Sequence, residues 1–356
     1  MKYRWIPASG AALAMAVLIL DPRTALQGTS EGIDLCLQTV IPSLFPFLLL
    51  SYILTASLSA TAPKFLQPLG KWLGISTEAV PIYLIGLVGG YPAGAQAVSV
   101  QYSSGAISAA EARRMVVFCN NAGPAFFFGI GAVVFGQASL ALLLWVIQIL
   151  SSLCCARCLG RRTDREQTDF APIAITRPEF MKKTVENMAM ICAWVVIFRI
   201  LLAFLQHWFL WMLPIGVQVG LCGVLEMTNG CCQLTDLPLL GQRLLFFSAF
   251  SAFGGFCILL QTFCITANSH IPIKMYLPGK LLQLSFSILM ATAAQLFLVP
   301  SQRAFPSAII LGLCFLYCLA FLLIRRKKDV AIPRKLMYNE GKYRMRGNHY
   351  AVSQKN

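Results

Sequence analysis

Glu226 carries the strongest chemical signal in this chain. It interrupts an apolar stretch and is followed by Thr228 and Asn229, which add a hydroxyl and an amide. A carboxylate at membrane depth is costly, so it is a candidate for function by default. Glu226 could carry a proton or hydrogen-bond a substrate, with Thr228 and Asn229 beside it. The alternative is a surface position at the tip of a hairpin.

Two adjacent amides form a second candidate. Asn120 and Asn121 stand just before Gly123 and Pro124, inside an apolar run. Pro124 has no N–H and bars the regular helical bond, which frees carbonyls one turn earlier. The two asparagines could close that break, as in a simple kink, or they could bind a substrate or Na⁺. Carbonyls exposed at such a break are the usual cation ligands of secondary transporters.

Three further side chains extend the set. Gln96 could contact a substrate or tie its own segment to a neighbouring helix, and Gln261 offers another amide. Arg199 lies in an apolar run, where it could provide the counter-charge for an anionic substrate or extend its guanidinium to the outer interface.

Glycine and proline interrupt the apolar stretches where a membrane helix should continue. In hydrocarbon an unpaired peptide group costs on the order of several kcal/mol, so broken helix is tolerated only in protein or beside a water-filled cavity. Paired breaks in the two halves of a chain indicate a transporter binding site. The residues at the breaks are Gly89, Gly90, Pro92, Gly94, Gly123, Pro124, Gly230, Gly254 and Gly255.

Composition identifies an integral membrane protein. Of the 356 residues, 57% are apolar and only 12% are charged, about half the charged share of a soluble domain. We predict an all-α polytopic fold with about eight transmembrane helices. Two apolar segments, 81–100 and 209–235, are too interrupted for simple spans and are interpreted as re-entrant hairpins. The predicted spans lie near 5–20, 33–60, 115–136, 137–156, 188–207, 244–268, 279–299 and 305–324.

The net charge of +15 is concentrated in segments that directly follow apolar spans. The positive-inside rule then places both termini in the cytoplasm, together with Lys274 and Lys280. No basic face on a soluble domain is expected, so we predict contact with a lipid bilayer and not with nucleic acid. The three histidines are scattered, and no phosphate loop, nucleophile elbow or paired carboxylates occur. We therefore expect no metal site, no cofactor and no enzymatic activity.

The order and orientation of the predicted spans and hairpins indicate two repeats of opposite orientation, each with a span, a hairpin, a broken span and a span. A homo-oligomeric assembly is left open. The predicted parts are an N-terminal transmembrane helix (1–30), a first repeat (31–156), a charged cytoplasmic linker (157–179), a second repeat (180–300), a last transmembrane helix (301–324) and a basic cytoplasmic tail (325–356).

Several motifs resemble those of the YlbJ/SpoVV sporulation integral membrane proteins, which belong to the nucleoside-recognition, or Gate, domain group. The first half carries the likeness in residues 89–96, 108–114 and 118–126. The second half adds residues 225–230 and the Phe253–Phe256 break, followed by Gln261. The resemblance covers roughly residues 30–300.

This resemblance implies transport of dipicolinate across the outer forespore membrane during spore formation. It also implies a fold similar to concentrative nucleoside transporters, whose substrate lies between two hairpin tips and two unwound helices. Those transporters carry an acidic residue in the first hairpin, and none occurs at 97–99 here. This departure argues against a nucleoside substrate. By the same similarity the site would be lined by Gln96, Asn120, Asn121, Glu226, Asn229 and the Phe253–Phe256 break.

We therefore predict a secondary transporter of a small organic anion, working by alternating access. The coupling ion stays open: Glu226 favours H⁺ and the carbonyls at Asn120–Pro124 favour Na⁺. The alternatives are a nucleoside or other metabolite transporter, and a membrane scaffold for spore envelope assembly that transports nothing.

Overall fold

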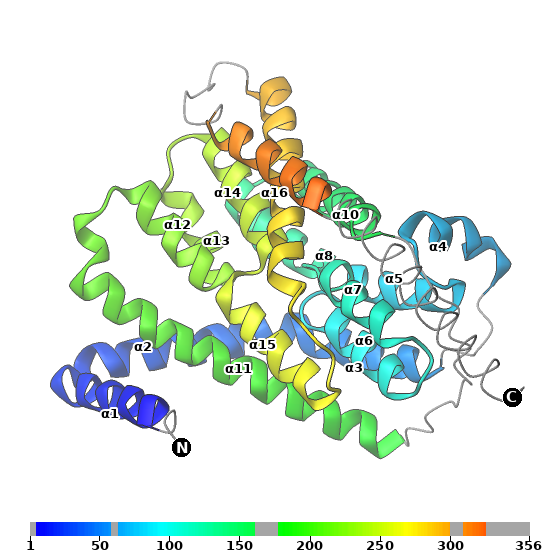
Figure 1. Ribbon diagram of the computed structural model, residues 1–356. Coiled ribbons are helices and arrows are strands. Elements are labelled where there is room, and N and C mark those ends of the chain that lie inside the picture. Colours follow the sequence, from blue (N-terminus) through cyan, green and yellow to red (C-terminus); the bar gives the residue numbers. More distant parts are fainter. Residues whose placement is uncertain (1–4, 58–62, 161–176, 300–308, 325–356) are drawn as a thin grey trace, which may run out of the picture. The chain divides into compact units, whose positions relative to one another are not determined.

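The computed structural model describes residues 5–57, 63–160, 177–299 and 309–324 (Figure 1). Most of the predicted linker and the whole predicted basic tail lie outside these ranges. The chain divides into two compact units, residues 1–304 and 305–356. In the second unit the described part is one apolar helix, Ile309–Ile324. All the regular structure of the described residues is helical, which confirms the predicted all-α fold.

Five helical segments of the described chain are long and apolar enough to cross a membrane. Two further helix pairs bend sharply, and counting each as one span raises the number to seven. A polytopic membrane protein is therefore supported, while the number of eight spans stays a prediction. The five segments are Ala109–Phe135, Ala138–Cys158, Met181–Trp208, Leu240–Asn268 and Tyr276–Leu298.

The N-terminal region is bent. Helix α1 (Trp5–Leu20) and the following helical segment, Pro22–Val40, meet at 101°. Asp21 marks the bend because its carboxylate accepts a hydrogen bond from Thr24 N at 3.2 Å, which starts α2 (Pro22–Leu35). A π-helical turn (Cys36–Val40) then leads into α3 (Ile41–Ser57). The boundary predicted between residues 30 and 31 falls inside α2.

The first hairpin consists of α5 (Val80–Gly89) and α6 (Ala93–Ser103), preceded by α4 (Gln67–Leu73). At about 1.5 Å per residue, each arm covers roughly half of a bilayer core of about 30 Å. Gly86 and Gly94 stand on either side of the turn, and a Cβ at either would lie 1.9 Å from the carbonyl oxygen of Cys119. The two arms therefore lie side by side against one neighbour.

That neighbour is the first broken span. Helix α7 (Ala109–Cys119) ends at the predicted break, and the chain resumes as α8 (Pro124–Phe126). A π-helical turn (Phe127–Gly131) and α9 (Ala132–Phe135) complete the span. Helix α10 (Ala138–Cys158) follows as an uninterrupted helix.

The second half repeats this succession. Helix α11 (Arg177–Trp208) precedes the second hairpin, α12 (Ile215–Leu225) and α13 (Met227–Cys232). A Cβ at Gly230 would lie 2.1 Å from Gly223 Cα, so these arms pack backbone to backbone. Helices α14 (Leu240–Phe253) and α15 (Gly255–Asn268) form the second broken span, and α16 (Tyr276–Leu298) ends the unit.

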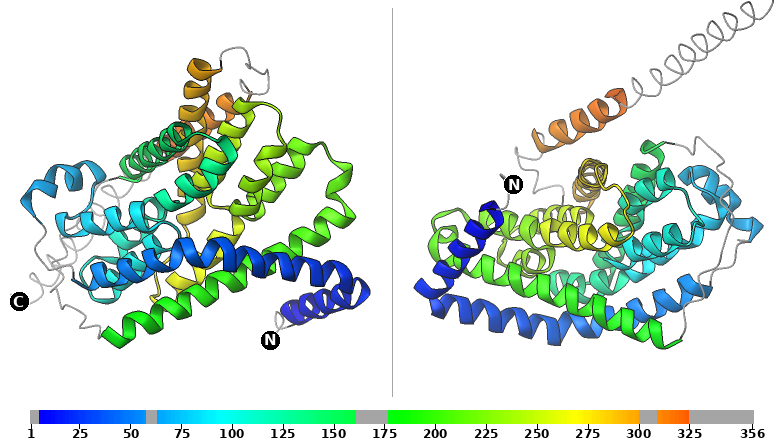
Figure 2. Two further views of the ribbon diagram at one scale, coloured as in Figure 1. Left: turned by 180° about the vertical axis from the view of Figure 1, so that it is seen from behind. Right: turned by 60° about the horizontal axis from the view of Figure 1, so that its bottom comes forward.

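Small residues join α2 to α11, which run side by side in all views (Figures 1 and 2). A Cβ at Gly28 would lie 2.9 Å from Ile200 Cα, and one at Gly32 would lie 3.0 Å from Val196 Cα. The spacing is the Gly-x-x-x-Gly pattern that lets membrane helices approach closely. The first helices of the two halves are thus in direct backbone contact.

An aromatic cluster joins the two broken spans. The ring centroids of Phe126, Phe127 and Phe135 lie 5.4, 5.7 and 5.5 Å from that of Phe247 on α14. Phe127 and Phe247 are fully buried. Aromatic pairs at these separations add stabilisation beyond that of burial. Because the rings come from both halves of the chain, the core of the unit lies between the two halves.

We expect Gly94→Ala to destabilise the protein, because its methyl group would collide with the Cys119 carbonyl and backbone must move. Overpacking of this kind costs about 1–3 kcal/mol. The check is the melting temperature of the purified protein in detergent. Gly216→Ala on α12 is the matched control, since nothing lies within 4 Å of a Cβ there. Equal melting temperatures for the two variants would contradict the packing.

Candidate functional site

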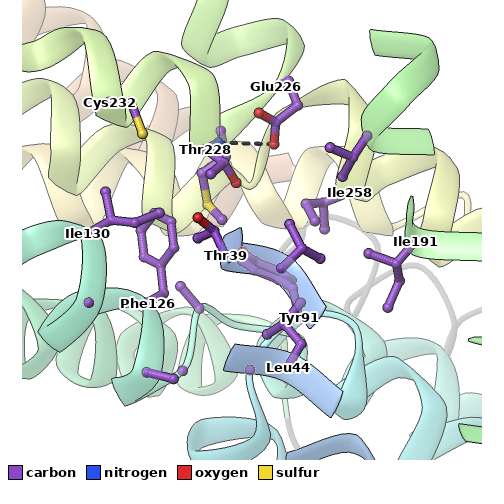
Figure 3. A pocket seen from close by; sticks show the side chains of 18 of the residues that line it. Thr39, Leu44, Tyr91, Phe126, Ile130, Ile191, Glu226, Thr228, Cys232 and Ile258 are labelled. Atoms are coloured by element: carbon purple, nitrogen blue, oxygen red, sulfur yellow. Dashed lines mark hydrogen bonds between the residues drawn. The ribbon is translucent and has the colours of Figure 1, made fainter. Parts of the chain in front are cut away.

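A cavity of about 540 Å³ lies where both hairpins and both broken spans meet (Figure 3). This volume is in the range of small-molecule sites, and most of the wall is apolar, as such sites usually are. The π-helical turn before α3 and the middle of α11 close the remaining sides. The polar side chains of the wall are Thr39, Tyr91, Glu226, Thr228, Thr235 and Gln261.

Glu226 is the one charged side chain among the described residues that line the cavity. It is 2% exposed, so the alternative of a surface carboxylate is wrong. The carboxylate caps α13 by accepting hydrogen bonds from Thr228 N at 3.0 Å and Asn229 N at 2.7 Å. The side chain of Asn229 donates a third hydrogen bond to this carboxylate, from Nδ2 at 2.8 Å. These donors explain how a carboxylate can be held in a buried position.

Gln261 on α15 presents an unpaired acceptor. Its side chain is 1% exposed and lines the cavity, and its Nε2 donates to Cys257 Sγ at 3.3 Å. Its Oε1 has no hydrogen-bond partner in the described part of the chain. Buried polar atoms are normally satisfied, so this oxygen is an acceptor for a solute that carries an N–H or O–H group.

The tip of the first hairpin forms the opposite wall. Gly90 has φ +75°, a conformation that L side chains rarely adopt, and it allows the chain to reverse there. A Cβ at Gly123 would lie 2.9 Å from Gly90 Cα, so the tip contacts the first helix break through backbone alone. Gly89, Gly90 and Gly123 all line the cavity.

The two asparagines of the first break lie behind this wall, where they bond to other parts of the protein. Asn120 Nδ2 donates to Thr262 Oγ1 at 2.8 Å and to Tyr276 OH at 3.0 Å, and Asn120 Oδ1 accepts from Ala95 N. Both asparagines are fully buried. Asn120 therefore joins the first break to both hairpin arm α6 and the second broken span.

Asn121 has the same structural role on the other side. Its Nδ2 donates to Phe118 O, the carbonyl left free at the end of α7. Its Oδ1 accepts from Gln148 Nε2 at 3.2 Å and Gln283 Nε2 at 2.7 Å. Of the two alternatives for these asparagines, the observed bonds match closure of the break.

The remaining predicted residues lie away from the cavity wall. Gln96 is half-buried and accepts a hydrogen bond from Asn187 on α11 at 3.3 Å, which ties the first hairpin to a neighbouring helix. Arg199 forms an ion pair with Glu31 on α2, so its charge is already met within the protein. Gly254 and Gly255, with φ of +84° and +77°, break the second span.

Lys280 is the residue whose burial the sequence interpretation missed. Its side chain on α16 is 0% exposed, so protein encloses it, while its placement on the cytoplasmic side stays a prediction. Its ammonium donates to Tyr91 OH at 3.0 Å, to Gln283 Oε1 at 2.9 Å and to Asn120 O. A lysine four residues into an apolar span was a usable signal, since ionisable residues in membrane spans are functional candidates.

Within the described ranges, no three His, Cys, Asp or Glu side chains gather where they could hold a metal ion.

Comparison with known proteins adds one relative. The chain is 26% identical over 317 residues to the sporulation integral membrane protein YlbJ of Bacillus subtilis (strain 168). The match covers 75% of this chain and 77% of the relative. The chain is YlbJ-like. No family model and no solved structure matches it, so the likeness of this YlbJ-like protein to nucleoside transporters stays a prediction.

Replacing Asn120 by alanine in the YlbJ-like protein should lower its stability by about 1–3 kcal/mol, because buried donors and acceptors lose their partner. Gln96→Ala is the comparison, since that half-buried amide has one longer bond. Thermal unfolding in detergent measures both. A larger loss for Gln96→Ala than for Asn120→Ala would refute the assignment of Asn120 to the closure of the break.

Proposed function

We propose that this protein is a secondary transporter that moves a small organic solute by alternating access through the cavity. One observation carries the proposal: the cavity is bounded by both hairpin tips, by the first helix break and by α15, the helix that follows the second break. Irregular backbone at membrane depth is tolerated where it is buried or lines a cavity, and paired discontinuous segments are how transporters build their sites.

The proposed substrate class is a small organic anion, with dipicolinate as the first compound to test. The wall contains one carboxylate and no cation among its described residues, so a bound anion faces Glu226 at close range. A proton on Glu226 removes this repulsion and turns the carboxylate into a donor. We therefore propose that the protein carries the acid together with a proton. The proposed location is the outer forespore membrane, with both ends of the chain in the cytoplasm.

Filling the cavity should stop transport. Gly129 lines the cavity, and nothing lies within 4 Å of a Cβ there. We expect Gly129→Leu to fold normally and to lose at least about tenfold in uptake of dipicolinate into proteoliposomes, the equivalent of roughly 1.4 kcal/mol. Gly216→Leu, which also has open space but does not line the cavity, is the control.

Equal uptake by Gly129→Leu and wild type would exclude the cavity as the transport site. If a verifiably folded wild type takes up no dipicolinate under any ion gradient, that substrate is excluded and nucleosides are assayed next. Failure of both substrate classes would favour the scaffold alternative.

Glu226→Gln tests the proton. The amide keeps the size and one acceptor oxygen but cannot release a proton. We expect accumulation driven by a pH gradient to be lost, while exchange between equal internal and external substrate continues. Glu186→Gln is the control, because the Glu186 carboxylate is 61% exposed on α11. Undiminished pH-driven accumulation by Glu226→Gln would show that the proton is carried elsewhere.

A further inference from the structure

The ammonium of Lys280 lies in a shell made only of oxygen atoms. Its three N–H groups meet three acceptors: the Tyr91 hydroxyl, the Gln283 side-chain oxygen and the Asn120 carbonyl. In the described part of the chain no carboxylate lies within 4 Å of it. A buried lysine usually has an acidic partner, so this charge is balanced in another way.

Helix ends provide the balance. Asn120 is the residue at which α7 stops, and its carbonyl belongs to the negative end of that helix. Tyr91, which accepts from Lys280, donates to the carbonyls of Ser251 and Ala252 at 3.2 and 3.3 Å. These carbonyls stand in the last turn of α14, directly before its break at Gly254. The Lys280 ammonium therefore contacts the carboxyl end of α7 directly and is linked to that of α14 through the Tyr91 hydroxyl.

The same shell orients the asparagines. Gln283 accepts from Lys280 through Oε1 and donates to Asn121 through Nε2, so its amide is fixed in one orientation. The Tyr91 ring adds a cation–π contact, with its centroid 5.0 Å from Nζ. Tyr91 also lines the cavity, so the ammonium lies directly behind the wall.

We propose that the Lys280 ammonium is a built-in cation that occupies the position of a coupling Na⁺ between the two helix breaks, so that the protein works without Na⁺. Carbonyls at the carboxyl ends of broken helices are the groups that coordinate Na⁺ in secondary transporters. Here the Asn120 carbonyl is already taken by Lys280. The test by uptake rests on the proposed transport function. The test by protein stability does not depend on it.

Stability in defined salts is the first test, and it needs no substrate. The melting temperature of wild type in detergent should be the same in NaCl, KCl and choline chloride at equal ionic strength. Lys280→Ala should melt lower by about 5 °C or more, and Na⁺ or ethylammonium should restore part of this loss, while choline should not. Lys280→Met should melt as low without any restoration, because its side chain fills the space. Lys274→Ala, at an exposed lysine, is the control.

Uptake by wild type is the second test. Replacing all Na⁺ by choline should change the rate of uptake by less than about twofold, because no Na⁺ takes part in the cycle. A requirement of wild type for Na⁺, in uptake or in melting temperature, would overturn the inference. So would a Lys280→Met variant as stable as wild type. If no substrate is transported but the melting temperatures behave as stated, the transport proposal fails and the built-in cation stands.

Discussion

A helix that stops inside a membrane protein leaves carbonyls without partners, and the arrangement of this molecule follows from how they are satisfied. Two spans break, at Asn120 and at Gly254, and hydrogen bonds link one buried lysine to the ends of both broken helices. Lys280 reaches the first break directly and the second through Tyr91, which belongs to the first hairpin. One cation thus links hairpin, both broken spans and α16, and the cavity lies directly in front of this group.

Much of the architecture could be predicted because local chemistry dictates it. Glycine and proline at 89–94 and at 123–124 produce the hairpin turn and the first break whatever surrounds them. The glycines at 254 and 255 do the same for the second break. Motif likeness led to the YlbJ-like relationship that sequence comparison supports. The sequence indicated a functional Glu226 inside an apolar stretch and left a surface position open, whereas its burial and its cap on α13 come from the structure.

The partners of the buried polar residues could not be predicted, because they come from distant parts of the chain. Asn120 bonds to Thr262 and Tyr276, more than 140 positions away. The sequence alone left Arg199 as a possible counter-charge for an anionic substrate. In the structure its guanidinium pairs with Glu31 on α2, next to the close backbone contact at Gly28 and Gly32. The burial of Lys280 was missed because counting charges treats each lysine as exposed. Only the packing of α16 shows that this one is enclosed.

The contact between Gly90 and Gly123 has a consequence for the mechanics of the cavity. Two backbones meet there without side chains, so no rotamers interlock at this contact. The phenylalanine rings around Phe247 are tightly packed and resist sliding, whereas the contact of Gly90 with Gly123 has no side chains that interlock. The glycine pair lets the hairpin tip and the helix break touch through backbone, and the hydrogen bonds of Asn120 to Ala95 N and of Lys280 to Tyr91 and Asn120 hold the two together, so any separation has to break those bonds.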